Sequence, residues 1–263
     1  MIRAFSTLGC VDASLDELFN LARRFDCALE FRGLAGRLDV PTALEEICGT
    51  PEEFASRVRA AGVRVASLDT SFRFFAAAEA DRTELLRYVP WAEALGGVRL
   101  RVFDGGKTLD APTLAAGVKE WQWWAAQRAE HGWKSDVMIE THDALVSAAP
   151  IQEWLAAAPD AGILWDAQHT WRKGGEDPLR TWRAIRGSVV HVHVKDSVSR
   201  PSERHPFTYV LPGDGEFPMA ALRRQLQADG YTGPISLEWE RHWHPELAPI
   251  EHALSAATDR NWW

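Results

Sequence analysis

The stretch Val189-Val190-His191-Val192-His193-Val194-Lys195-Asp196 predicts a buried β-strand whose last residues are polar. The run is short and rich in β-branched valine, which is typical of a strand inside a parallel sheet. Seven other apolar runs follow the same design, and helical segments separate them along the chain. The eight predicted strands are residues 2–5, 28–31, 63–68, 98–103, 137–140, 162–166, 189–194 and 234–239.

The segments between these strands carry recognisable helix starts. Ser14-Leu15-Asp16-Glu17 is a capping box, in which the serine and the glutamate satisfy each other's free backbone N–H groups. Thr50-Pro51-Glu52-Glu53 adds a proline at the first helical position, and Asp81-Arg82-Thr83-Glu84 opens a third helix. The longest helix is predicted over 111–131. Its three tryptophans point to more than one side, so we expect one or two to meet a loop or a second subunit of a homo-oligomer.

The alternation of eight strands with helices predicts the fold class. It is typical of an α/β protein in which a parallel sheet closes into a single (β/α)8 TIM barrel, here spanning residues 1–263. The alternative is an open, doubly wound sheet, which normally has a glycine-rich phosphate-binding turn after its first strand. Leu8-Gly9-Cys10 is not such a turn, and no linker-like segment divides the chain. The closed barrel is therefore favoured.

Composition and charge exclude several classes of function. The chain is 46% hydrophobic and 25% charged, as in an ordinary globular protein, and no apolar run is long enough to cross a membrane. Its net charge of -8 repels a phosphate backbone, which argues against nucleic acid as a partner. The first residues lack a signal-peptide pattern, and the three cysteines lack zinc-site spacing. We therefore expect reduced thiols and a cytoplasmic location.

Four consecutive predicted strands end in acidic residues or histidine: Glu140, Asp166, His193 and Glu238. The first two intervals are 26 and 27 residues, about one strand–helix unit each, whereas the third is 45 residues. The polar stretch 197–217 accounts for the excess and is the predicted substrate-covering loop. Because the active site of such a barrel forms at the carboxyl ends of its strands, these four side chains should meet there.

Three carboxylates at one barrel mouth repel each other unless a cation lies between them. One imidazole with three carboxylates is an oxygen-rich set that suits Mn²⁺, Mg²⁺ or Co²⁺. We predict a divalent metal, Mn²⁺ first, with Zn²⁺ as a further alternative. The ion would polarise a substrate carbonyl and stabilise an enediolate. Any one of these residues alone would more often be structural, and His191 is either a support for the site or part of the core.

At these residues the chain resembles the sugar isomerase/epimerase superfamily with a xylose isomerase-like TIM barrel, which includes ketose 3-epimerases, inosose isomerases and dehydratases. The resemblance rests on Ile139–His142, Leu164–His169, His191–Asp196, Pro212–Phe217 and Leu237-Glu238. It implies that the metal ligands are Glu140, Asp166, His193 and Glu238. It also implies that the two glutamates act as acid and base on opposite sides of the sugar.

The same resemblance implies a set of substrate-binding residues. His169 stands three residues after the aspartate, as in these families, and Arg101 begins a frequent Arg-Val-Phe motif. We place His142 and Lys195, at the ends of two further strands, in the same role. The barrel is also similar to that of endonuclease IV-type repair enzymes, which need histidines from early strands. All nine histidines here lie at or after His131, which excludes that nuclease.

The predicted function is a metal-dependent isomerase or epimerase of a small ketose, a polyol-derived ketone or a keto-sugar. It would remove a proton next to the carbonyl and return one to the other carbon or face. A dehydratase that uses the same enediolate is an alternative, and a non-catalytic carbohydrate-binding barrel is another. A small sugar or polyol is the expected partner, and no membrane is expected.

Overall fold

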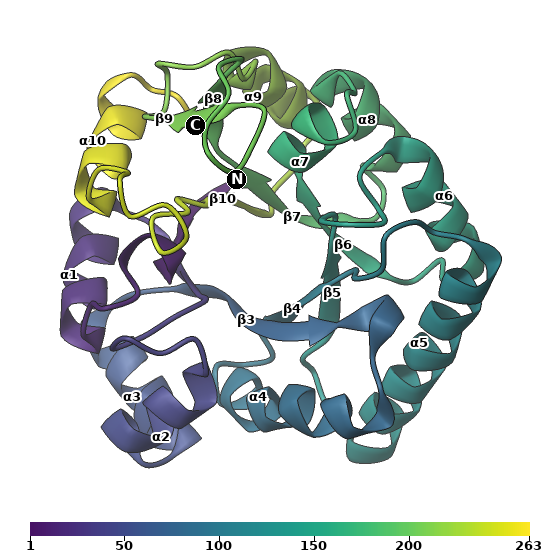
Figure 1. The fold of residues 1–263 in the computed structure, drawn as a ribbon. Helices are drawn as coiled ribbons and strands as arrows, with labels where there is room; N and C mark the ends of the chain where they lie inside the picture. Colours follow the sequence, from purple (N-terminus) through teal and green to yellow (C-terminus); the bar gives the residue numbers. More distant parts are fainter.

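Eight parallel strands close into a barrel in the computed structural model, which describes residues 1–263 (Figure 1). The order around the barrel is β1-β10-β7-β6-β5-β4-β3-β2, so β1 pairs with both β10 and β2. The predicted single (β/α)8 barrel is confirmed. Its strands are β1 (Ile2–Ser6), β2 (Ala28–Phe31), β3 (Val65–Arg73), β4 (Arg99–Phe103), β5 (Val137–Glu140), β6 (Gly162–Asp166), β7 (Val189–Val194) and β10 (Pro234–Leu237).

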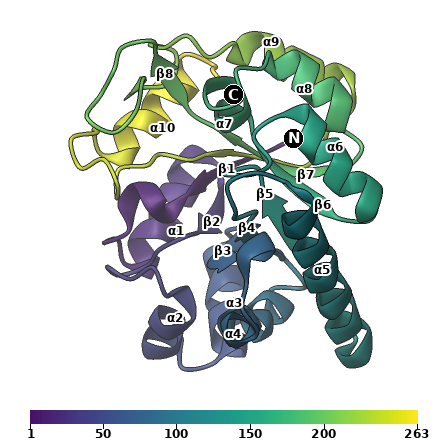
Figure 2. The same ribbon diagram turned by 45° about the vertical axis from the view of Figure 1, so that its right-hand side comes forward.

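Ten helices surround the strands, as the two views show (Figures 1 and 2). None of them is long and apolar enough to cross a membrane. They are α1 (Leu15–Phe25), α2 (Val40–Cys48), α3 (Pro51–Ala61), α4 (Arg82–Ala94), α5 (Ala111–His131), α6 (Ala148–Ala157), α7 (Ala167–Arg172), α8 (Pro178–Ile185), α9 (Met219–Ala228) and α10 (Ile250–Asp259).

The predicted helix starts can be compared with these bounds. Ser14 and Glu17 form the expected capping box at the start of α1, and the Thr50 side chain caps α3. Asp81 does not cap α4: its carboxylate accepts from the backbone N–H of Ala78 at 2.8 Å and so closes a short 3-10 turn that precedes the helix. Residues 111–131 form α5 as predicted.

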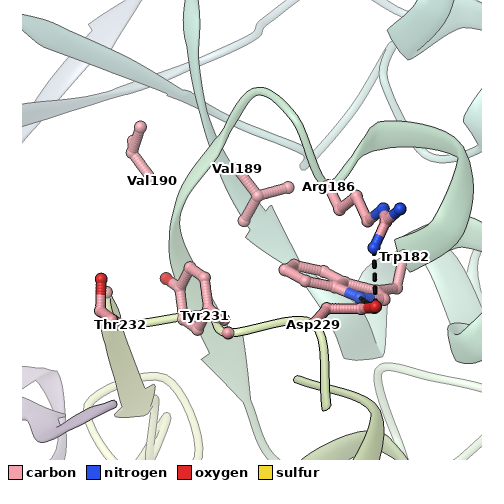
Figure 3. A pocket seen from close by; sticks show the side chains of 9 residues that line it. Trp182, Arg186, Val189, Val190, Asp229, Tyr231 and Thr232 are labelled. Atoms are coloured by element: carbon pink, nitrogen blue, oxygen red, sulfur yellow. Dashed lines mark hydrogen bonds and ion pairs between the residues drawn. The ribbon is translucent and has the colours of Figure 1, made fainter. Parts of the chain in front are cut away.

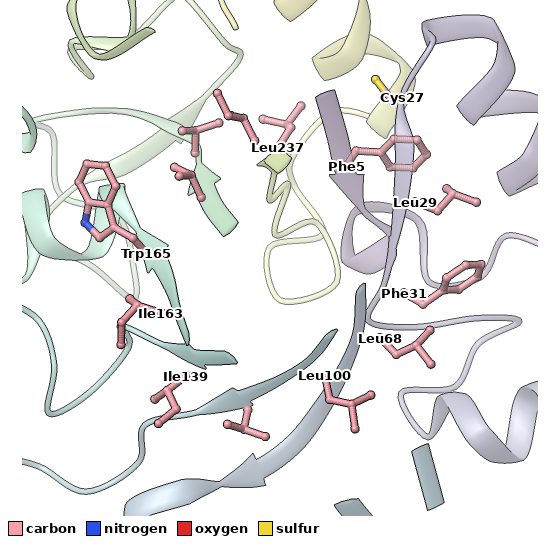
Figure 4. Close-up of a cluster of buried hydrophobic side chains, with 14 of the residues drawn as sticks. Phe5, Cys27, Leu29, Phe31, Leu68, Leu100, Ile139, Ile163, Trp165 and Leu237 are labelled. Atoms are coloured by element: carbon pink, nitrogen blue, oxygen red, sulfur yellow. The ribbon is translucent and has the colours of Figure 1, made fainter. Parts of the chain in front are cut away.

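Strand alternation divides the side chains between two environments. One set packs outward between the strands and the helices, where it forms a large apolar core that includes Phe5, Phe31, Ile163 and Trp165 (Figure 4). The other set points into the barrel and is unusually polar. Its buried members are Glu30, Ser67, Asp69, Arg101, Glu140, Asp166, His191, His193 and Ser236. Polar side chains inside a barrel need partners, and those partners build the site.

The segment between β7 and α9 differs in part from the prediction. The expected loop at 197–217 contains a small antiparallel hairpin, formed by β8 (Asp196–Val198) and β9 (Thr208–Val210). Asp196 holds the hairpin's base, because its carboxylate accepts from the backbone N–H groups of Gly213, Gly215 and Phe217. Since β8 begins two residues after β7 ends, the hairpin starts at the barrel mouth.

Candidate active site

The four residues singled out by spacing converge at the mouth of the barrel. Each of Glu140, Asp166, His193 and Glu238 offers one ligand atom, and these atoms all lie within 4.8 Å of one another. The four side chains are buried, Glu238 being the most exposed at 6%. They come from or directly follow β5, β6, β7 and β10, which are neighbours around the barrel. Residues up to 98 positions apart in the chain thus form one cluster.

The chemistry of this cluster fits a divalent cation. An oxygen of Asp166 and the Oε2 atom of Glu140 face the cations of Lys195 and Arg101, whereas the Oε1 atom of Glu140 and the Nδ1 atom of His193 are buried without a hydrogen-bond partner. Such acceptor atoms are costly to bury unless a cation or donor satisfies them. One imidazole nitrogen with several carboxylate oxygens is a ligand set for Mn²⁺, Mg²⁺, Co²⁺ or Zn²⁺. We therefore take these four residues as the candidate metal ligands.

His193 is held in one orientation by a carboxylate behind it. Its Nε2 atom lies 3.0 Å from Glu30, in β2, while its Nδ1 atom lies 3.7 Å from Glu140 and 3.4 Å from Glu238. The carboxylate behind the ring therefore leaves Nδ1 as the atom that faces the acidic cluster. His191 binds the same glutamate through Nε2 at 2.8 Å, so it supports the site from below. Burial would lower the pKa of His193, but Glu30 and Glu238 outweigh it and raise that pKa.

Arg101 lies beside Glu140 inside the barrel. Its Nε atom is 3.3 Å from Glu140 and 3.7 Å from Asp69, and its side chain is 1% exposed. The expected substrate-binding arginine is thus paired with one of the candidate ligands. Burial would raise the pKa of Glu140, but the Arg101 guanidinium and His193 outweigh burial and hold that pKa below its ordinary value. Glu140 is therefore a carboxylate at neutral pH.

Lys195 places an ammonium group against the other side of the cluster. It pairs with Asp166 at 2.9 Å, with Glu240 at 2.7 Å and with Glu238. Burial would lower the pKa of Lys195, but Asp166 and the two glutamates outweigh it, so the pKa is raised and the group stays charged. Tyr209 of the hairpin donates to Glu240 at 3.0 Å. The hairpin is therefore connected to the cluster by a chain of contacts, from Tyr209 to Glu240 and from Glu240 to Lys195.

The two remaining predicted substrate contacts sit on the rim. His169 places Nδ1 3.0 Å from Asp166, and its ring meets that of His142 edge to face at 4.9 Å. His142 is half-buried and also packs on Phe103 at 4.8 Å. Gln168 is fully buried, with neither amide atom hydrogen-bonded within the chain. These side chains extend the polar surface beyond the four candidate ligands.

Three tryptophans next to site residues do not contribute to the mouth. Trp165 packs outward on Trp182, with ring centres 5.9 Å apart, and Trp239 is buried with its N–H donated to the carbonyl of Ala248. Trp171 packs against Phe217 of the segment after the hairpin. Because these rings are engaged in packing, a stacking platform for a sugar does not come from them.

A pocket of about 480 Å³ lies far from this cluster, at the amino ends of β7 and β10 (Figure 3). Val189, Val190 and Tyr231 line it, and Arg186 pairs with Asp229 at its edge at 2.6 Å. Side chains at this end of a TIM barrel serve stability, whereas the catalytic groups lie at the opposite end. The pocket is therefore not the candidate active site.

Sequence reasoning missed the contribution of the early strands. Glu30, Arg32 and Asp69 stand in or just after β2 and β3, and all three are buried at or near the mouth. Glu240 was missed as well, although it follows Glu238 by two residues and binds the same lysine, Lys195. A signal was available for Glu30, since a single charge inside the apolar run Ala28–Phe31 must find a buried partner.

Comparisons with known proteins place the chain among similar barrels. The probable 3-DHS dehydratase AsbF from Bacillus anthracis has a TM-score of 0.77 and 17% identity, with 99% of this chain and 100% of that chain covered. The IolI protein, solved with a binding zinc atom, gives 0.76 and 15%, covering 99% and 96%. The 3-keto-D-glucoside 4-epimerase YcjR from E. coli gives 0.72 and 14%, covering 99% of both chains. At such low identity these likenesses show the fold.

No curated protein matches the chain by sequence. A family model, described as the xylose isomerase-like TIM barrel, matches residues 28–260. That range holds seven of the eight barrel strands and all four candidate metal ligands. The chain therefore belongs to the xylose isomerase-like TIM barrel family.

Proposed function

We propose that the protein is a divalent-metal-dependent isomerase or epimerase of a small ketose, polyol-derived ketone or keto-sugar. The observation that carries this proposal is the convergence of ligand atoms of Glu140, Asp166, His193 and Glu238 within 4.8 Å, where Oε1 of Glu140 and Nδ1 of His193 have no hydrogen-bond partner. These four residues would hold the metal. When bound, the ion supplies Lewis acidity that makes the proton next to a substrate carbonyl easier to remove.

Glu140 and Glu238 form the proposed acid–base pair. They lie at the two ends of an arc of four neighbouring strands, and His193 contacts both of them through Nδ1. Two carboxylates in such positions can approach a small substrate from different sides, so one removes a proton and the other returns one. Glu140 meets the first requirement of a base, because Arg101 and His193 keep it ionised.

The other polar residues bind and orient the substrate in this proposal. His142 and His169 stand on the rim beside Asp166, where they can donate to or accept from substrate hydroxyl groups. Lys195 and Arg101 are placed behind the glutamates, so they stabilise negative charge at the two ends of the arc. In this proposal, protons are transferred only at Glu140 and at Glu238.

A dehydratase is the second candidate, and Lys195 is the observation that favours it. Its charged ammonium contacts Glu238 and Glu240, so a protonated group lies next to one member of the acid–base pair. Loss of a hydroxyl group develops negative charge at the leaving oxygen, and a fixed ammonium in this position would stabilise that charge. The similarity in fold to a probable dehydratase agrees with this alternative.

Exchange of substrate protons with D₂O tests the proposal. The protein is incubated with Mn²⁺ and with D-fructose, D-ribulose, scyllo-inosose and a 3-keto-glucoside, and deuterium incorporation is followed by NMR. We expect the wild type to exchange one C–H next to the carbonyl of at least one compound. Glu140→Gln and Glu238→Gln keep the size of the side chain but remove its charge, so exchange should slow by about 10²–10⁴.

The outcomes separate the alternatives. Epimerised or isomerised product supports the proposal, whereas loss of water identifies the dehydratase. Binding without exchange or product, in wild type and variants alike, would show a carbohydrate-binding barrel instead. If both glutamine variants exchange at the wild-type rate with metal bound, the acid–base pair is wrong.

A further inference from the structure

Arg32 is a buried cation without a carboxylate partner. It follows β2 directly, and only 5% of the residue is exposed. Its single side-chain hydrogen bond goes from Nη2 to the hydroxyl of Ser71 at 3.1 Å, and its buried Nη1 atom has no acceptor. Arginine is almost never buried in this state unless it is paired. The unused donors of Arg32 therefore require an explanation that the metal site does not give.

A second arginine makes the local charge more positive. Arg32 and Arg101 both approach the ring of Phe103, with guanidinium carbons 5.9 Å and 4.0 Å from its centre. Arg101 is paired with Asp69 and Glu140, yet its Nη1 atom also lacks a hydrogen-bond acceptor. Burial, and then the charge of Arg101, lower the pKa of Arg32, and the more distant charges of Asp69 and Glu140 offset this only in part. The two cations are thus held close together although they repel.

The backbone at this position is fixed. The Thr7 hydroxyl accepts from the backbone N–H groups of Arg32 and of Gly33, both at 2.9 Å, and donates to the carbonyl of Gly33. Arg32 is therefore anchored at its base, and its guanidinium is held near β3 and β4. A donor held in place before binding loses less entropy when it meets its ligand.

The position of Arg32 points to the substrate. β2, β3 and β4 form the arc of the mouth that faces the strands of the metal ligands, so a small molecule bound at the acidic cluster would extend towards it. A guanidinium offers paired N–H donors that match the two oxygens of a carboxylate or a phosphate. We propose that Arg32 binds an anionic oxygen group of the substrate, which makes the substrate an acidic keto-sugar or polyol acid. This inference rests on the proposed function, because it takes the acidic cluster as the second anchor.

Binding of three matched probes tests this assignment. D-Glucitol, D-gluconate and D-glucitol 6-phosphate share a six-carbon polyol chain and differ in the group at one end. Affinities are measured by isothermal titration calorimetry on the Mn²⁺-loaded protein. We expect one of the two anions to bind at least tenfold more tightly than D-glucitol, and the preferred anion identifies carboxylate or phosphate as the recognised group.

The variants separate Arg32 from the metal as the source of this preference. Arg32→Met should weaken binding of the preferred anion by about ten- to hundredfold, with D-glucitol unchanged. Arg99→Gln is the control, because Arg99 lies in the same barrel at the other end of β4 and pairs with Asp136. It should keep the preference of the wild type. A carboxylate bound only by the metal would bind equally to all three proteins.

Thermal unfolding gives a readout that a purely structural arginine would not produce. Removing a buried charge that has no ion-pair partner should leave the melting temperature of the ligand-free Arg32→Met protein equal to or above that of the wild type. If this variant does not fold, Arg32→Gln, which can still donate to Ser71, carries the same binding test. The proposal is overturned if the wild type shows no anion preference, or if the folded Arg32 variant retains it. Neither result depends on proton exchange, so the proposed reaction can fail separately.

Discussion

The two halves of the barrel mouth differ in charge: carboxylates are in excess in one half, whereas in the other two arginines stand beside two carboxylates, Glu30 and Asp69. The acidic half, formed by β5, β6, β7 and β10, has buried atoms without a hydrogen-bond partner, among them Oε1 of Glu140 and Nδ1 of His193. The basic half, formed by β2, β3 and β4, has guanidinium donors without acceptors, on Arg32 and Arg101. Unpaired groups of both kinds are costly to bury, and a ligand of the opposite character would satisfy each of them.

This difference shows why the barrel interior is polar at all. An apolar interior would be more stable, because buried charges lose their hydration. Both halves of this barrel nevertheless contain buried charged groups. The two halves contact each other where Glu30 meets His193 and where Arg101 meets Glu140, Glu30 and Arg101 belonging to the basic half. Four predictions test how independent the two halves are.

The largest effect should come from removing one candidate ligand from the acidic half. Asp166→Ala should weaken Mn²⁺ binding on the order of 10²-fold, since four ligands together supply on the order of 10 kcal/mol in structural metal sites. Chelation should then no longer change the melting temperature. Asp69→Ala is the matched control, because Asp69 is an equally buried aspartate of the basic half. Equal losses in both variants would show that the halves do not differ.

The second prediction concerns the pH dependence of stability. Burial would raise the pKa of Glu240, but Lys195 outweighs it and lowers that pKa to about 2. A lowered pKa in the folded state stabilises the protein above the ordinary value near 4.5, and this contribution is lost as the pH falls through about 2. Glu240→Gln should therefore lower the free energy of unfolding by about 3 kcal/mol at pH 7.

Denaturant unfolding of the chelated protein at several pH values measures this contribution. The difference between wild type and Glu240→Gln should shrink as the pH approaches 2. A difference that stays constant with pH would mean that the glutamate acts through its size and not through its charge.

The third prediction probes the contact between the halves. Glu30→Gln leaves a hydrogen-bonding group against His193 but removes the carboxylate that orients the imidazole and makes it more basic. Affinity for Mn²⁺ should fall about 10–100-fold, as for other partners of metal-binding histidines. Glu30→Asp should recover part of it. If calorimetric titration finds wild-type Mn²⁺ affinity in Glu30→Gln, metal binding depends on the acidic half alone.

The smallest effect is expected at the hairpin. Tyr209→Phe removes the hydrogen bond to Glu240 and should cost about 1 kcal/mol of unfolding free energy. Tyr231→Phe removes a comparable bond, to the carbonyl of Pro234, at the far end of the barrel. Hydrogen exchange over 197–217 should increase in the first variant alone. An increase in both would mean that the hairpin responds to global stability and not to the acidic half.

The sequence predicted the acidic half better than the basic half, and the reason is physical. Glu140, Asp166 and His193 recur at the length of one strand–helix unit, so the period of the fold itself marks them. Their ionisable side chains also follow strongly apolar runs, which makes each one visible. Asp69 lies inside its strand, because β3 runs four residues beyond it and ends at Arg73. Arg32 directly follows β2 but is neither a carboxylate nor an imidazole. A search of strand ends for acidic residues and histidine therefore misses both.

The sequence by itself determined the barrel, the places of its eight strands and the four residues that gather at its mouth. These properties follow from local patterns: apolar runs of strand length, capping residues and the alternation of strands with helices. Only the tertiary structure decided which nitrogen of His193 faces the cluster, that Lys195 binds three carboxylates, and that Arg32 is left without one. Those contacts join side chains from strands that are far apart in the sequence, and no periodic sequence pattern indicates which side chains meet across a closed barrel.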